Sequence, residues 1–184
     1  SADTADNLPC FFHGTHISLT SNLCQEPFFF YGNMRIPGTF RKREVGKPVA
    51  WKILDHTADA GFEAEADTLA EIFLDAAEAF LFIAAGPAPG DFSETGEFHT
   101  FFLSAVDGEE LAVSWINELI FIAETRSEWF LPLQVRVSLS PPSLSARGKT
   151  VALKGRALSV KAATYGGLQL RTSPRPFLRM YFDL

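Results

Sequence analysis

A short polar stretch near residue 55 carries residue types that can bind a cation. It reads Asp55-His56-Thr57-Ala58-Asp59 and follows the segment Trp51–Leu54, so we expect a turn at the end of a short strand. Loops that a strand holds in place are common positions for binding groups. Two carboxylates four residues apart can supply oxygen ligands to one ion, whereas Asp and Thr also form turns through local hydrogen bonds. Both interpretations stay open at this point.

The end of the chain supplies a second group of oxygen atoms. Asp183 is the only acidic residue among the last 56, and it directly precedes the terminal Leu184. The Asp183 side chain and the terminal carboxylate of Leu184 are two anions that repel each other at this distance unless a cation joins them. If a sheet brings Asp59 alongside, the cluster would suit Ca²⁺, Mg²⁺ or Mn²⁺, because zinc prefers nitrogen and sulfur ligands. The alternative is a chain end that frays.

Four residues near the start of the chain have a spacing that zinc ligands can adopt. They form a C-x2-H-x2-H-x7-C pattern: Cys10, His13, His16 and Cys24. This spacing differs from that of the usual zinc fingers, so we do not favour a zinc site. Two cysteines also make no disulfide framework, and we expect a reducing compartment.

Composition indicates a folded protein of one domain with an extension. The chain has 184 residues, of which 47% are apolar and 21% charged. The longest charge-free stretch near the helical signals, residues 79–90, is too short to span a bilayer and contains two prolines. No secretory signal is visible. We therefore expect a cytoplasmic protein with no membrane partner, and the sequence indicates no oligomeric state.

The net charge of −6 conceals an uneven distribution. Residues 51–128 contain 17 Asp and Glu against 2 Lys and Arg, a balance of −15. Residues 129–184 contain 1 against 9, a balance of +8. The simpler interpretation is that the basic part neutralises the acidic part within one fold. The functional alternative is a surface that docks on a charged partner.

Periodicity predicts an α+β fold, with two helices packed on a mostly antiparallel sheet. Thr68 and Glu71 have the spacing of a capping box and predict a helix that begins there and runs to about residue 83. Asp107 and Glu110 have the same spacing and predict a second helix that runs to about residue 123. In the second helix Trp115 is expected to be a packing residue. Strands are expected at residues 51–54, 62–67, 96–104 (with Phe98 and Phe102 among its apolar positions), 131–139, 150–160, 161–170 and 177–184.

Residues 1–50 show neither a helical nor a strand period. We expect an N-terminal extension there, partly disordered and without a role that the sequence indicates. The folded domain is expected to cover residues 51–184.

Four segments of this domain together resemble the archease family. They occur in the family's order and at its spacing: Ile53–Asp59 after a Trp, Asp107–Leu111 leading to Trp115–Leu119, Val160–Tyr165, and Phe182–Leu184. One block would be weak evidence, whereas four in order are specific. The resemblance covers residues 51–184 and implies an archease-like domain.

The resemblance implies a protein that is not itself a catalyst. Archeases activate the RtcB-type tRNA-splicing ligase, which joins RNA ends through a guanylate on its own histidine. The activator promotes that guanylylation and multiple turnover. GTP and RNA are therefore expected to be indirect partners, bound by the ligase. The family's divalent-cation site corresponds to Asp59, Asp183 and the main-chain oxygen of Leu184, with Ca²⁺ preferred over Mg²⁺ or Mn²⁺. Lys161 is expected to contact the ligase or nucleotide.

The residues beside the predicted ligands are expected to support them. Asp55, His56 and Thr57 would form the turn, or they would hydrogen-bond to the ligand residues without contacting the cation themselves. Two features depart from the family pattern. Gly166 stands where a His commonly follows the Thr-Tyr pair, and residues 141–147 are Ser- and Pro-rich, which suggests a longer loop.

Two other functions compete with ligase activation. A general chaperone or RNA-binding module would use the aromatic residues of the extension and the basic strands. The chain is acidic overall and has no aromatic-rich RNA-binding signature, so we expect little direct contact with RNA. A metal-dependent phosphoester hydrolase would use His56, Asp59 and Asp183. It is less favoured, because the sequence shows no nucleophile–base pair and no Gly-rich phosphate loop.

Overall fold

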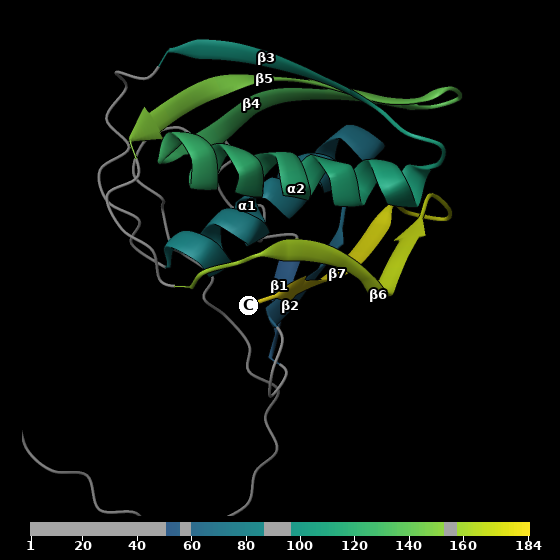
Figure 1. Cartoon of the computed structure of the whole chain (residues 1–184). Coiled ribbons are helices and arrows are strands. Elements are labelled where there is room, and N and C mark those ends of the chain that lie inside the picture. The colour runs from purple at the N-terminus through teal and green to yellow at the C-terminus, as the bar shows by residue number, and fades with distance from the viewer. Residues whose placement is uncertain (1–50, 56–59, 87–96, 153–157) are drawn as a thin grey trace, which may run out of the picture. The chain divides into compact units, whose positions relative to one another are not determined.

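The computed structural model describes residues 51–55, 60–86, 97–152 and 158–184. These residues confirm the α+β class (Figure 1). In chain order the elements are β1 (Trp51–Asp55), β2 (Ala60–Glu65), α1 (Leu69–Ala85), β3 (Phe98–Ser104), α2 (Gly108–Arg126), β4 (Glu128–Leu139), β5 (Pro142–Ala152), β6 (Ala162–Arg171) and β7 (Phe177–Asp183).

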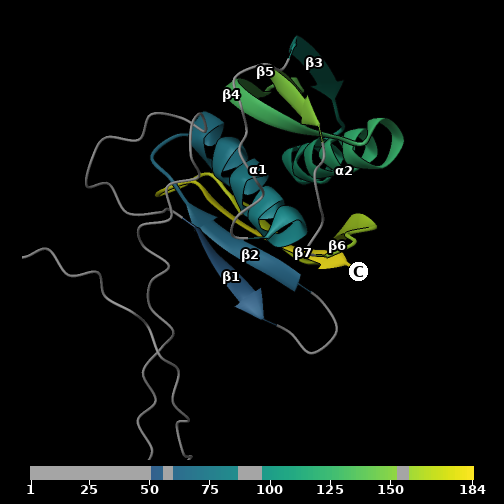
Figure 2. The same ribbon diagram turned by 90° about the vertical axis from the view of Figure 1, so that its left-hand side faces the viewer.

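The strands form two sheets, and this corrects the expectation of one. One sheet has the order β1-β2-β7-β6 and the other β3-β5-β4, and all their pairs are antiparallel. Both helices lie between the sheets (Figures 1 and 2). Because α1 touches β1, β2 and β7 on one side and β4 on the other, it is buried over most of its circumference. A single sheet would leave one helix face in water.

Capping residues start both helices at the predicted positions. Thr68 Oγ1 accepts a hydrogen bond from Glu71 N at 3.2 Å, and Glu71 Oε2 accepts one from Thr68 N at 3.1 Å. At α2, Asp107 Oδ1 accepts from Glu110 N at 2.8 Å. These bonds satisfy main-chain donors that the first helical turn leaves without partners. Each helix ends slightly later than expected, at Ala85 and Arg126. Neither helix is long and apolar enough to cross a membrane, in the part of the chain that the structure describes.

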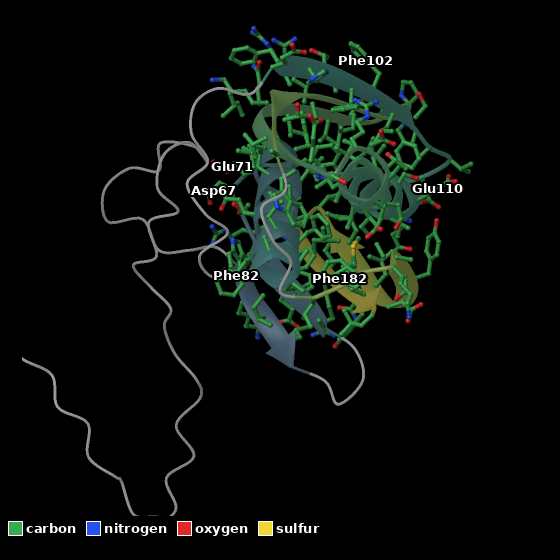
Figure 3. The ribbon with its side chains drawn as sticks, turned by 60° about the vertical axis from the view of Figure 1, so that its left-hand side comes forward. Asp67, Glu71, Phe82, Phe102, Glu110 and Phe182 are labelled. Carbon is green, nitrogen blue, oxygen red and sulfur yellow. The ribbon has the colours of Figure 1, made fainter. Side chains whose placement is uncertain are left out.

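Aromatic side chains join the helices to both sheets. Phe182 of β7 packs against Phe62 of β2 and Phe80 of α1, with ring centroids 5.9 and 6.0 Å apart. Trp115 is fully buried, and its Nε1 donates to the carbonyl oxygen of Phe73 at 2.9 Å. Its predicted role as a packing residue is confirmed. Figure 3 shows Phe182 within the lower sheet, beneath the helices.

The prediction of a longer loop at residues 141–147 is wrong. Leu139 and Pro142 are paired across a tight turn, and β5 begins at Pro142. Its side chains alternate, with Leu144 and Ala146 buried and Arg147 exposed. The Ser and Pro content concealed this period of two, which is the strand signal. The strand expected at 150–160 is also too long: β5 ends at Ala152, and the described residues 158–161 form no strand.

Ion pairs connect the basic and acidic parts of the domain. Arg175 Nη2 lies 2.6 Å from Asp67 Oδ1, and Arg179 and Lys52 both contact Glu63. Two of these three cations come from the basic C-terminal part and pair with acids of residues 51–128. The pairs favour the simpler interpretation of the uneven charge.

Candidate functional site

Three distant segments meet at one end of the four-stranded sheet. Ala60 of β2 and Ala163 of β6 are both paired with Phe182 of β7, so the three residues form a row across the sheet. One position further along, Asp183 is paired with Ala162. Ala60 is also paired with Asp55, the last residue of β1. The chain therefore brings the two ends of the polar turn and the C-terminus to the same edge of this sheet (Figure 2).

The sequence of these strands explains their close approach. Leu178, Met180 and Phe182 alternate along β7 and are buried, which fixes the register of the central strand. Gly61 lies against β7 so closely that an added Cβ would be 2.7 Å from the Met180 oxygen and from the Tyr181 ring. A larger residue would push the two strands apart.

Hydrogen bonds hold the end of the chain. The main-chain N–H of Lys161 donates to the Asp183 carbonyl at 2.8 Å, and Lys161 Nζ donates to the Leu184 oxygen at 2.6 Å. Sequence reasoning gave Lys161 a contact with a partner and did not foresee this internal one. The ammonium places a positive charge beside the Leu184 oxygen. It therefore offsets part of the repulsion that suggested a cation site.

Asn117 is a further member of the site that sequence reasoning missed. Its Oδ1 accepts a hydrogen bond from Ala163 N at 2.8 Å, which ties α2 to the edge of β6. Thr164 Oγ1 donates to the Tyr181 carbonyl at 3.3 Å on the other side of the same strand. The available signal was an amide residue inside an apolar helical pattern. The second, third and fourth family blocks are thus joined by direct contacts.

Some of the predicted site residues lie in the described part of the chain, and the others lie outside it. Asp183, which is exposed, and Leu184, which is half-buried, lie at the end of β7. Asp55 ends β1. Several predicted residues lie outside the described residues: His56, Thr57, Asp59, Cys10, His13, His16 and Cys24. Within the described ranges no three His, Cys, Asp or Glu side chains form a group that could hold a metal ion. The meeting of Asp59 with Asp183 stays a prediction.

Gly166, where the resemblance implies a histidine, does not reflect a lack of space. Gly166 lies in an irregular part of β6, between the paired residues Thr164 and Gln169. An added Cβ there would meet only Thr164 Oγ1, at 3.8 Å. Gly167 differs, since its φ of +71° and the Tyr181 ring at 2.9 Å both disfavour a side chain. The irregular segment leaves Tyr165 60% exposed beside the site.

The pKa of the Glu63 carboxyl is lowered from its ordinary value. Burial alone would raise the pKa of this carboxyl, but hydrogen bonds from Lys52 and Arg179 and their positive charges outweigh burial and lower it. Arg179 Nε donates to Glu63 Oε1 at 2.6 Å, and Lys52 Nζ lies 2.6 Å from Oε2. Residues 52, 63 and 179 form a row across β1, β2 and β7. This row fixes the strands that carry the site.

Comparisons with known proteins agree with this arrangement. Residues 51–184 match the model of the Archease protein family (MTH1598/TM1083). Protein archease from Methanosarcina barkeri is 31% identical over 129 residues, which cover 65% of this chain and 85% of that protein. The solution structure of Methanobacterium thermoautotrophicum protein 1598 is similar, with a TM-score of 0.55 and 27% identity over 74% of this chain and 99% of that one. This chain belongs to the archease family.

Proposed function

We propose that this protein is a non-catalytic activator of an RtcB-type RNA ligase, acting in the cytoplasm on tRNA splicing or RNA repair. Family membership over residues 51–184 supports the activator role. The observation that carries the proposal at the level of residues is the pairing of Ala60 with Phe182. Ala60 follows Asp59 in the sequence and Phe182 precedes Asp183, so the register favours the meeting of the two carboxylates.

Asp59, Asp183 and the main-chain oxygen of Leu184 would hold a divalent cation, with Ca²⁺ preferred over Mg²⁺ or Mn²⁺. The residues fit a hard cation, because all three donors are oxygen atoms and Asp183 is exposed at the end of an anchored strand. When bound, the ion would supply a concentrated positive charge for a phosphate or carboxylate of the ligase complex. Lys161 holds the main chain of Asp183 and Leu184 in place, which opposes fraying, and its ammonium would have to share or release the Leu184 oxygen when a cation binds.

The described residues place no histidine beside Asp183, and His56, which the hydrolase alternative would use, lies outside them. Their one histidine is His99, whose ring stacks on Phe101 with centroids 6.5 Å apart, in the other sheet. It therefore lies on a different sheet from Asp183. The exposed ammonium of Lys161 at the site suits an anionic partner better than a reaction centre.

Ligase guanylylation, measured with and without this protein, tests the proposal. We expect Asp183→Asn to lower the stimulation by roughly tenfold or more, the scale of losing a group that supports a metal ion. Glu109→Gln, which changes an exposed acid in the first turn of α2, should stimulate like the wild type. A chelator should reproduce the loss, and added Ca²⁺ should restore it.

Calorimetric titration with Ca²⁺ separates metal binding from ligase docking. The wild type should bind, and Asp183→Asn should bind more weakly while it keeps its circular dichroism spectrum and its unfolding midpoint. If Asp183→Asn is folded and stimulates the ligase as well as the wild type does, the site is not the functional one.

A further inference from the structure

The outer face of the three-stranded sheet carries aromatic and basic side chains together. Opposite residues of an antiparallel pair share a face. The registers of β3 with β5 and of β5 with β4 therefore define this outer face by its members: Phe98, Thr100 and Phe102 of β3, Ser145, Arg147 and Lys149 of β5, and Gln134 and Arg136 of β4. The opposite face, with Phe101 and Ala146, packs toward the core.

The two phenylalanines are unusually accessible for their size. Phe102 is 78% exposed and Phe98 is 56% exposed, whereas large apolar side chains are usually buried. Figure 3 shows Phe102 projecting outward from β3, away from the helices. From the sequence, Phe98 and Phe102 are predicted only to be apolar positions of a strand. The structure shows that neither one belongs to the core.

Two cations lie beside the Phe98 ring on this face. Arg147 Cζ and Lys149 Nζ each lie 5.0 Å from the centroid of the Phe98 ring, and Arg136 is exposed two strands away. Among the residues of β3, β4 and β5, the only acid is Glu128, at the start of β4. The members of the outer face thus include three cations and no acid, on a chain whose net charge is −6, although the exposed Glu97 directly precedes β3.

The overall acidic charge led us to expect little direct contact with RNA, but this local arrangement differs from the average, and we propose that the outer face binds single-stranded nucleic acid. Bases would stack on Phe98 and Phe102, and the phosphates would contact Arg136, Arg147 and Lys149. Exposed aromatic rings flanked by cations on an antiparallel sheet bind single strands through stacking and charge, with little dependence on sequence. An apolar protein surface would offer no anion to Arg136 and Arg147.

The spacing of the rings favours a single strand over a duplex. Phe98 and Phe102 are four residues apart on one strand, which corresponds to roughly 13 Å. This exceeds the ~3.4 Å rise of one stacked base step. The rings would therefore hold bases that are not neighbours in a stack, and bases paired inside a duplex are not available for this. The inference does not depend on ligase activation, because it concerns the other sheet.

Fluorescence anisotropy with a labelled ten-nucleotide uridine RNA tests the inference, using the full chain without ligase. We expect binding that weakens by about tenfold in Phe102→Ala and again in Phe98→Ala. Phe121→Ala serves as the matched control, because Phe121 is 53% exposed on α2 and lies off the face. A duplex of the same length should bind more weakly than the single strand, and a DNA oligomer identifies the preferred sugar.

The charges are tested in the same assay. The logarithm of the binding constant should fall with the logarithm of salt concentration, with a slope near −2 if three phosphates are contacted. Arg147→Ala should reduce this slope, and Arg175→Ala, which removes an exposed Arg paired with Asp67, should not.

Three results would overturn the inference. One is no RNA binding at concentrations up to about 100 µM, the weak limit of non-specific binding. Another is binding that the Phe98 and Phe102 variants leave unchanged. The third is that these variants weaken only the ligase complex, which would make the face a protein-docking surface. Since Asp183 lies on the other sheet, the Asp183→Asn experiment can fail without affecting this one.

Discussion

Glu63 shows how one buried carboxylate connects three strands. Its side chain is 11% exposed and contacts Lys52 of β1 and Arg179 of β7. Two cations on one carboxylate satisfy it better than a single surface pair would, and together they lower its pKa. The sequence shows the three residues but not their meeting, because 63 and 179 are far apart in the chain.

Glu63→Gln should destabilise the protein by about 1 kcal/mol at pH 7, since a charge-assisted interaction is replaced by a neutral one. Because the folded-state pKa is lowered, the contribution of Glu63 is present above the unfolded-state pKa of about 4.3 and is lost as the pH falls through the folded-state value. Urea unfolding of both proteins from pH 7 to pH 3 should show the difference shrinking below about pH 4.3.

Glu65→Gln is the control for that measurement. Glu65 is exposed at the end of the same strand, so this change should leave the free energy of unfolding nearly unaltered. An effect of Glu63→Gln that stays constant down to pH 3 would contradict the ionic origin of the stabilisation.

At the level of elements, the contact between α2 and β6 orients the site. Asn117 accepts a hydrogen bond from the Ala163 N–H. Ala163 is paired with Phe182, which directly precedes the Asp183 held by Lys161. The irregular part of β6 lies directly beyond Thr164. A helix residue therefore fixes the regular end of a strand that is otherwise interrupted.

Asn117→Ala should lower the free energy of unfolding by about 1–2 kcal/mol, because it leaves the partly buried Ala163 N–H without its acceptor. Hydrogen exchange at the Ala163 amide should accelerate more than exchange in β5, which belongs to the other sheet. Asn117→Asp keeps an acceptor oxygen and should lose less. If both variants lose the same stability, the hydrogen bond is not the cause.

At the scale of the whole molecule, the family match covers residues 51–184. The helices and strands of the described residues lie in the same range. The buried aromatic core comes entirely from that range, among the residues that the structure describes. The domain thus holds the helices, both sheets and the ion pairs that join its acidic and basic parts.

Removal of residues 1–50 should leave the domain folded. The shortened chain should keep the urea midpoint of the full chain, because none of the described core contacts is removed. Comparison of the two unfolding curves and of two-dimensional NMR spectra checks this. A shortened chain that aggregates, or that unfolds at distinctly lower urea, would show that the first fifty residues contribute to stability.

Local patterns determined much of this protein. Capping residues and a helical apolar period located α1 and α2, and alternation located β2 and β4, because these signals act over a few residues. The family was indicated separately, by the resemblance of four segments to the archease family. The local patterns failed at residues 141–147, where turn-forming residue types outweighed a clear alternation.

Only the tertiary structure decided how the elements share the core. It produced two sheets around the helices, the row of Ala60, Phe182 and Ala163, and the exposed position of Phe98 and Phe102. A period of two shows that a strand has two faces but not which one meets a helix. Contacts such as Lys161 with Leu184 join distant residues, and no local signal specifies them, since they arise only when packing fixes the register of the central strand.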